Sequence, residues 1–303
     1  MLHLIPKTNI DFIGKRYFFF CFTGLLLLSG IISLTLKGGP RWGLDFTGGT
    51  LVEVKFKDPL SLEEVRKALT SANIPSFEIQ SVSGQGYIIR TQLVAGKDNK
   101  DQDVGVAIVS AITQSFPNES VDILRKEFVG PSVGKHLGRQ TLTAFLLTFV
   151  GIIIYVGFRF RSGVWGVSGV FALVHDVLAT VGVFSMCNKE ISVTVVAALL
   201  TIAGYSITDT IVIYDFMRER LRMRKTESMG ELINRSLNET LSRTIITSLT
   251  VFMVSVVLFF FGGEVIHDFA FAMVFGVAIG TYSSIAVAAP MIYEWEMHKN
   301  KAK

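Results

Sequence analysis

Six long apolar runs dominate the sequence, and each has about the length of a membrane-crossing helix. Four of them contain no Asp, Glu, Lys, Arg or His, the third holds only His175 and Asp176, and the fourth holds only Asp209. A helix needs about 20 apolar residues to cross the hydrocarbon core of a bilayer. The pattern therefore predicts a polytopic α-helical membrane protein with six transmembrane helices, within residues 17–36, 140–158, 162–188, 191–214, 244–263 and 269–293.

The first run follows basic residues, as the core of a signal peptide does. Lys7, Lys15 and Arg16 precede it, and it continues into Lys37 without a small-residue cleavage pattern. Its apolar stretch is also longer than the roughly 7–15 residues of a signal-peptide core. We therefore expect an uncleaved transmembrane helix at 17–36 that follows a short N-terminal segment, residues 1–16.

The basic residues of the short connections predict the orientation of the chain. Lys and Arg gather in the N-terminal segment, in the turn with Arg159 and Arg161, in a loop at 216–243 and in a tail at 296–303, whereas the short loops of the opposite side contain only Lys189. Short loops rich in Lys and Arg stay in the cytoplasm. Both termini and the loop at 216–243 are therefore expected in the cytoplasm, with residues 140–295 forming a five-helix membrane region.

Residues 37–139 form a polar block between the first two runs, and they are expected outside the cytoplasm. Ser61 and Glu64 have the spacing of a capping box at the start of a helix. A turn at 83–86 joins two strand-like segments as a hairpin. The order of elements predicts an α+β, ferredoxin-like (βαββαβ) extracytoplasmic domain, with strands at 50–56, 77–82, 87–92 and 121–129 and helices at 62–69 and 103–116.

The composition argues against a disordered protein, a fibrous protein and an ordinary soluble enzyme. The chain has 303 residues, of which 50% are hydrophobic and 18% are charged, with a net charge of +4 and a mean hydropathy of +0.48; soluble domains carry about 25% charged residues. Cys21 and Cys187 lie within two of the apolar runs, which argues against a disulfide framework or a thiolate zinc site. No basic stripe with interleaved aromatic residues supports nucleic-acid binding. The glycine-rich segment 38–50 lacks the Lys of a phosphate-binding loop, and we interpret it as a tight entry into the first strand.

Asp209 is the first candidate for chemistry inside the membrane. Tyr205 and Ser206 precede it by four and three residues and extend a polar stripe along its helix. A carboxyl on such a stripe can donate to a hydroxyl or water when it is protonated, and it needs a cation when it is ionised. Ionisable residues within transmembrane helices are costly and usually functional.

Arg243 begins the fifth run at the same end of the membrane where Asp209 lies in the fourth. Thr247 and Ser248 continue a polar face behind it. Two interpretations stay open: a pair with Asp209 that separates when a proton arrives, which would be a two-state element, or a static arginine that pairs with Asp209 or extends to the headgroups.

His175 and Asp176 lie in the middle of the third run. They are candidates for a second relay station. An interhelical hydrogen bond, worth about 0.6 kcal/mol on average in membranes, is an equally good interpretation.

Four motifs resemble a known family. They are 42–50 (WGLDFTGGT), 174–177 (VHDV), 204–215 (GYSITDTIVIYD) and 243–250 (RTIITSLT). Together with the layout of one helix, a large outer domain and five helices, they resemble the SecD/SecF family of protein-export membrane proteins over about residues 10–295, and its SecF branch more than its SecD branch. Thr208 departs from the pattern, because many members carry Asn there.

The resemblance implies an RND-type transporter superfamily member that is not an enzyme: an accessory subunit of the Sec translocase in the cytoplasmic (inner) membrane that uses the proton-motive force to promote protein export. It implies no cofactor, with protons or sodium ions as coupling ion. The family's ion-conducting aspartate falls on Asp209, its arginine partner on Arg243, and its His-Asp position on Asp176. The implied partners are SecD, the SecYEG channel, the SecA motor, YajC or YidC, the unfolded exported protein and the lipid bilayer.

Two other functions compete. An intramembrane aspartyl protease needs two carboxyls on adjacent helices, here Asp176 and Asp209, but a Gly-x-Gly-Asp motif is missing and Arg243 is unfavourable beside a proton-sharing dyad. A small-molecule RND-type efflux component is less compatible with a single modest outer domain and one set of six helices.

Overall fold

A computed structural model gives the structure of the chain, and it describes residues 8–58, 60–74, 77–82, 86–91, 101–117, 119–223 and 227–301. The predicted hairpin turn at 83–86 lies largely outside the described residues. The chain divides into two compact units. One combines residues 1–41 with 142–303, and the other comprises residues 42–141.

Six helices within the described residues are long and apolar enough to cross a membrane, as predicted. The first five are α1 (Arg16–Leu36), α5 (Pro131–Phe160), α6 (Gly163–Met186), α7 (Val193–Met223) and α8 (Met229–Phe261). The sixth begins as α9 (Glu264–Ser283), passes through a π-helical turn, η1 (Ser284–Ala288), and ends as α10 (Ala289–Lys301).

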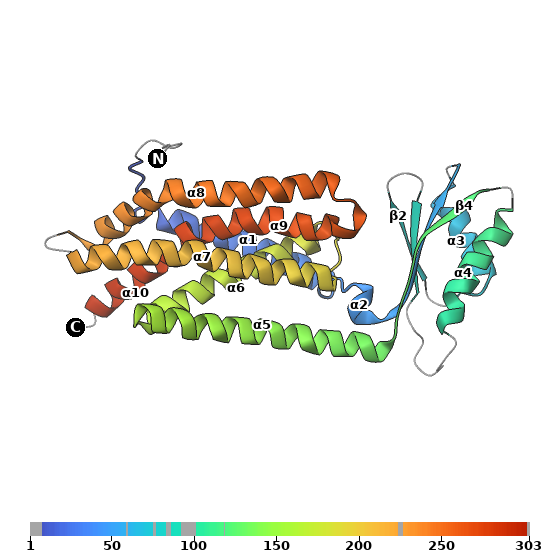
Figure 1. Cartoon of the computed structure of the whole chain (residues 1–303), viewed down its shortest axis with the longest axis horizontal. Coiled ribbons are helices and arrows are strands. Elements are labelled where there is room, and N and C mark those ends of the chain that lie inside the picture. Colours follow the sequence, from blue (N-terminus) through green and yellow to red (C-terminus); the bar gives the residue numbers. More distant parts are fainter. Residues whose placement is uncertain are drawn as a thin grey trace. The chain divides into compact units, whose positions relative to one another are not determined.

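The helical unit has an interior of three elements. The membrane-crossing parts of α6, α7 and the α9–α10 helix have more than half of their residues buried, whereas those of α1, α5 and α8 have fewer than one residue in five buried. Figure 1 shows α8 running alongside α9 and α7, with which it makes extensive contacts. Small residues allow α1 to approach α6 closely, because a Cβ atom added at Gly30 would lie 2.8 Å from the Cα atom of Gly182.

The segment at 216–243 is more helical than the sequence analysis expected. α7 continues to Met223 and α8 starts at Met229, so most of this predicted loop extends the two helices. Ser228 caps α8: its hydroxyl accepts from the backbone N–H of Glu231, and the Glu231 carboxylate accepts from the backbone N–H of Ser228. This reciprocal pair satisfies two backbone donors at the start of the helix.

The second unit contains an antiparallel sheet, and from β1 to β4 its described elements have the predicted βαββαβ order. The strand order is β2-β3-β1-β4, and Val52, Val54 and Ile89 belong to its buried core. The elements are β1 (Gly49–Phe56), α3 (Leu62–Ser71), β2 (Phe77–Val82), β3 (Gly86–Thr91), α4 (Asp101–Ser115) and β4 (Val121–Val129).

The glycine-rich segment leads into β1 by a tight path, as interpreted from the sequence. A one-turn helix that was not predicted, α2 (Leu44–Thr47), precedes Gly48 and Gly49, whose φ angles are 69° and 135°. Such positive φ angles favour glycine. At Gly49 a Cβ atom would also lie 2.2 Å from the carbonyl oxygen of Thr91, so the close approach of β1 to β3 requires glycine there.

Candidate functional site

Asp209 lies on α7 with its carboxylate turned toward α8. Its side chain is almost fully buried. The hydroxyl of Ser248 donates to Oδ2 at 3.2 Å, and that of Thr247 lies 3.4 Å from Oδ1. Ser248 in turn accepts from the hydroxyl of Thr281 on α9 at 2.7 Å. A chain of hydroxyls therefore connects the buried carboxyl to two neighbouring helices.

Arg243 lies one helical turn before Thr247 on α8, and its side chain is exposed. In the described part of the chain it forms no ion pair with Asp209 within 4.0 Å, although it is near enough to act on that carboxyl electrostatically. The Thr247 hydroxyl also lies within hydrogen-bonding distance of the Arg243 carbonyl. Hydroxyls, and not a guanidinium, are thus the direct partners of Asp209 in this structure.

The structure separates the two residues that the sequence analysis placed beside Asp209 on α7. Tyr205 faces Thr247 and Ser248, but its buried hydroxyl makes no hydrogen bond to the described residues. Ser206 belongs elsewhere, because its hydroxyl donates to Asp176 on α6 at 2.6 Å. Around α7, Ser206 lies about 60° to one side of Asp209 and Tyr205 about 40° to the other side, so Ser206 contacts α6 whereas Asp209 contacts α8.

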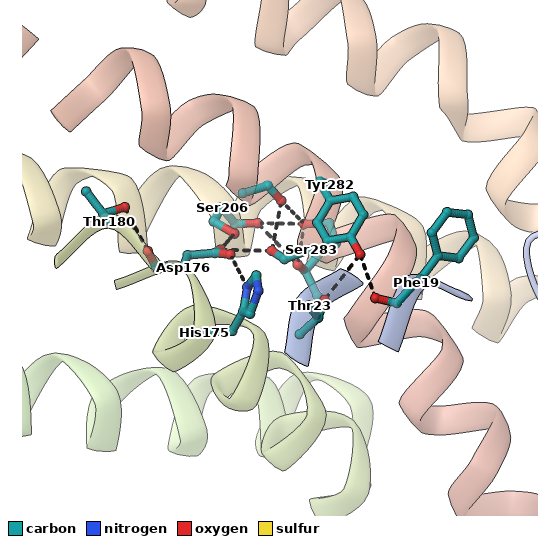
Figure 2. Close-up of polar contacts among 11 residues, drawn as sticks. Phe19, Thr23, His175, Asp176, Thr180, Ser206, Tyr282 and Ser283 are labelled. Carbon is teal, nitrogen blue, oxygen red and sulfur yellow. Dashed lines mark hydrogen bonds and ion pairs between the residues drawn. The ribbon is translucent and has the colours of Figure 1, made fainter. Parts of the chain in front are cut away.

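Asp176 is the centre of a second, fully buried cluster (Figure 2). Its Oδ2 atom accepts from the hydroxyls of Ser206 on α7 and Ser283 on α9, at 2.6 and 2.9 Å. Its Oδ1 atom lies 3.0 Å from Nδ1 of His175. Thr180 does not contact the carboxylate and donates instead to the backbone carbonyl of Asp176. The cluster therefore joins α6, α7 and α9.

Sequence reasoning missed the contribution of α9. Thr281 and Ser283 reach the clusters of Asp209 and Asp176, respectively. The sixth run contains no charged residue, and only charged residues within the apolar runs were considered as candidates. Its signal was the polar sequence Thr281-Tyr282-Ser283-Ser284 within an otherwise apolar helix.

The geometry does not favour a carboxyl dyad. Among the described residues, Asp176 and Asp209 share no hydrogen-bond partner, because the first is bound by Ser206 and Ser283 and the second by Thr247 and Ser248. An aspartyl protease needs two carboxyls close enough to share one proton. In the part of the chain that the structure describes, no group of three or more His, Cys, Asp and Glu side chains is arranged to hold a metal ion.

Comparison with known proteins gives consistent matches. The family model described as "Protein export membrane protein SecD/SecF, C-terminal" matches residues 108–298, and the "SecD/SecF GG Motif" model matches residues 33–60. Protein translocase subunit SecF of Endomicrobium trichonymphae is 46% identical over 301 residues, which cover 99% of this chain and 96% of the relative. The SecF subunit of Thermodesulfovibrio yellowstonii is 39% identical over 298 residues, with 96% of each chain covered.

A solved structure agrees with the curated relatives. The crystal structure of SecDF, a translocon-associated membrane protein from Thermus thermophilus, superimposes with a TM-score of 0.84 at 33% sequence identity. The match covers 98% of this chain and 40% of the SecDF chain. No comparison supports a protease or a small-molecule efflux component. The chain belongs to the SecD/SecF family of protein-export membrane proteins, among its SecF translocase subunits.

Proposed function

We propose that this chain uses the proton-motive force, together with SecD, to promote protein export as an accessory subunit of the Sec translocase. Its relatives are named translocase subunits, and the SecDF structure resembles nearly all of the chain. The observation that carries the proposed energy coupling is the buried Asp209 carboxyl, which accepts hydrogen bonds from hydroxyls of the adjacent helix.

Asp209 is suited to take up and release a proton. When it is ionised, its two oxygens accept from Ser248 and Thr247, as in the observed geometry. When it is protonated, one oxygen becomes a donor, so at least one of those hydroxyls must turn. Each proton therefore changes the hydrogen bonds between α7 and α8.

Arg243 provides the electrostatic part of the proposed cycle. Its side chain is exposed and forms no direct ion pair with Asp209 in the described structure. An ionised carboxyl in the membrane attracts a cation, whereas a protonated one does not. Movement of the guanidinium toward and away from Asp209 would then follow the arrival and departure of the proton, and it would move the start of the membrane-crossing part of α8.

The available energy limits the mechanism. Moving one elementary charge through 100 mV supplies about 2.3 kcal/mol. That is enough to bias a rearrangement of helices, but it is below the roughly 5–15 kcal/mol that stabilise a folded domain. The exported polypeptide must therefore arrive unfolded, and each proton drives one step of a ratchet.

The proposed setting is the cytoplasmic (inner) membrane, with both termini in the cytoplasm and the α+β unit on the outer side. The basic short loops support this orientation.

The proposed partners beyond SecD are the SecYEG channel, the SecA motor and YajC or YidC. Purification from native membranes in mild detergent should retain SecD, and recovery of the chain alone would contradict the partnership.

Ion flux through the complex with SecD, reconstituted in lipid vesicles, tests the proposed coupling. Asp209→Asn should abolish proton flux and the stimulation of export by a proton gradient, while assembly stays intact. Asp215→Asn is the matched control, because it makes the same change on α7 at a carboxyl that pairs with Arg159 and Arg218 outside the cluster. Unchanged proton flux in Asp209→Asn would refute the proposal. If the complex carried sodium ions along a sodium gradient and no protons, the coupling ion would be sodium.

A further inference from the structure

The second buried cluster contains a polar atom without a partner. His175 and Asp176 are 1% and 0% exposed. Nδ1 of His175 lies beside Asp176, but its Nε2 atom has no hydrogen-bond partner among the described residues. A buried polar nitrogen without a partner is rare, because its desolvation is not repaid. The position of this nitrogen, inside a membrane-spanning unit, therefore indicates a ligand that bonds to it.

Hydrogen bonding at the carboxylate indicates the charge of the histidine. Oδ2 of Asp176 already accepts from Ser206 and Ser283, and Oδ1 lies at hydrogen-bonding distance from the histidine nitrogen. A protonated Nδ1 of His175 would be a third donor to this carboxylate, and the resulting carboxylate and imidazolium would neutralise each other. An ionised carboxylate beside a neutral imidazole would leave a net negative charge buried in the membrane, which is costly.

Among the described residues, His175 is the only group that can be cationic within ion-pair distance of Asp176. In the described structure the titratable group that faces the pair is Tyr282 of α9, whose ring centroid lies 6.5 Å from that of His175. The Tyr282 hydroxyl is engaged with Thr23 and with the carbonyl oxygen of Phe19 on α1 (Figure 2). α7 contributes the Ser206 hydroxyl. The available counter-charge for an ionised Asp176 is therefore a proton on the imidazole of His175.

We infer that His175 and Asp176 form a second proton-binding site, in which an imidazolium is paired with the carboxylate and its Nε2–H donates to a buried water molecule. The site has other hydrogen-bond partners than that of Asp209, and it includes α6 where the Asp209 cluster includes α8. The protonation does not depend on the proposed function, whereas a role for it in transport does.

α9 provides a physical connection between the two sites. Thr281 donates to Ser248, the hydroxyl that binds Asp209, and Ser283 donates to Asp176. These two residues of α9 lie about 200° apart around the helix, so one helical turn is attached to both carboxyl clusters on nearly opposite faces. A rotation of α9 that follows a change at Asp209 must therefore disturb the donors of Asp176.

The π-helical turn η1 starts directly after Ser283. Single π-helical turns interrupt the regular hydrogen-bond ladder and are frequent at functional sites. Ser284 connects this turn to α7, because its hydroxyl lies 2.8 Å from that of Thr210. The irregular turn gives the segment at 281–283 a place where the helix can deform without moving the whole of α10.

Nitrogen NMR of the ¹⁵N-histidine-labelled full chain in lipid nanodiscs tests the proton directly. His175→Gln assigns the signals. At neutral pH the wild type should show both ring nitrogens of His175 protonated, and Asp176→Asn should convert the ring to a neutral form with one bare nitrogen. A neutral His175 in the wild type would overturn the inference. Ser283→Ala, which keeps both titratable groups, should leave the ring protonated and serves if Asp176→Asn fails to fold.

The same spectra test the connection through α9. Asp209→Asn and Thr281→Val should each shift the His175 signals. Thr201→Val is the matched control and should shift nothing, because within the described part of the chain its hydroxyl donates to the carbonyl of Ala197 on α7 and to no other group. Unshifted signals in Thr281→Val would refute the connection. Because these spectra need neither SecD nor a gradient, their failure is distinguishable from a failure of the flux experiment.

Discussion

The Ser248 hydroxyl donates to the Asp209 carboxylate across the contact between α7 and α8, at 3.2 Å. The same hydroxyl accepts from Thr281 on α9. One small side chain therefore connects the buried charge to both neighbouring helices, and its removal should affect the proposed ion pathway without removing any charge.

Ser248→Ala should slow proton flux through the reconstituted complex with SecD about fivefold, which corresponds to the loss of one hydrogen bond worth about 1 kcal/mol. The effect should be smaller than that of Asp209→Asn. Ser255→Ala is the control, because the Ser255 hydroxyl donates to the carbonyl of Val251 within α8 and, among the described residues, forms no hydrogen bond to either carboxyl cluster. Equal flux in the two serine variants would show that the hydroxyl chain does not support proton transfer.

Arg243→Ala should abolish the stimulation of export by a proton gradient, because the carboxylate of Asp209 would lose the mobile cation that follows its charge. Arg243→Lys should keep part of the activity if charge alone matters. Arg235→Ala removes another exposed arginine of α8, one that pairs with Glu227 at 3.4 Å, and it should behave as wild type. Export assays in inverted vesicles measure all three. Normal stimulation in Arg243→Ala would exclude the arginine from the cycle.

The sequence was sufficient to predict the features that depend on a pattern repeated over many residues. The six membrane-crossing helices follow from apolar length, and the βαββαβ order follows from alternation, the Ser61 cap and the glycine-rich turns. Helical spacing placed Thr247 and Ser248 on one polar face with Arg243, and the antiparallel arrangement of two consecutive helices brought the start of that helix to the same end of the membrane as Asp209, but it did not show that the hydroxyls are the direct partners of the carboxylate. These relations depend on neighbours in sequence or on successive helices, which one chain reveals by itself.

Contacts that involve side chains of three helices could not be predicted from the sequence. Whether Ser206 faces Asp209 or Asp176 depends on which helices lie on each side of α7, and spacing alone does not give that order. Thr281 and Ser283 were overlooked because hydroxyls are common in apolar helices and their partners come from distant segments. The distance between Arg243 and Asp209 depends on the rotamer of a long side chain, which no sequence pattern determines.

Glu64 should make the start of α3 sensitive to acid. Its carboxylate accepts from the backbone N–H and the hydroxyl of Ser61, which hold the pKa of Glu64 below its usual value. A lowered pKa in the folded state means that the stabilisation is complete above the unfolded value of about 4.3. It is then lost as the pH falls through the folded value.

Hydrogen exchange of the first-turn amides of α3 tests this prediction. Between pH 5 and the more acidic range, the wild type should lose protection relative to Glu64→Gln, which accepts the same bonds but does not titrate. Glu63→Gln, at the neighbouring exposed carboxyl, should retain the wild-type pH dependence. If the exchange rates of these amides had the same pH dependence in wild type and in Glu64→Gln, the capping box would not be the cause of the acid sensitivity of α3.

The crossing of α1 and α6 should depend on glycine at one position of α1 and not at another. A Cβ atom at Gly30 would lie 2.8 Å from the Cα atom of Gly182, whereas one at Gly24 on the same helix would meet no atom within 4 Å. Gly30→Ala should therefore force the two backbones apart and destabilise the chain by about 1–3 kcal/mol. Gly24→Ala should be neutral or slightly stabilising, because alanine favours a helix more than glycine does. Thermal unfolding in detergent compares the two variants, and a melting temperature that falls equally in both would show that close packing at Gly30 does not stabilise this crossing.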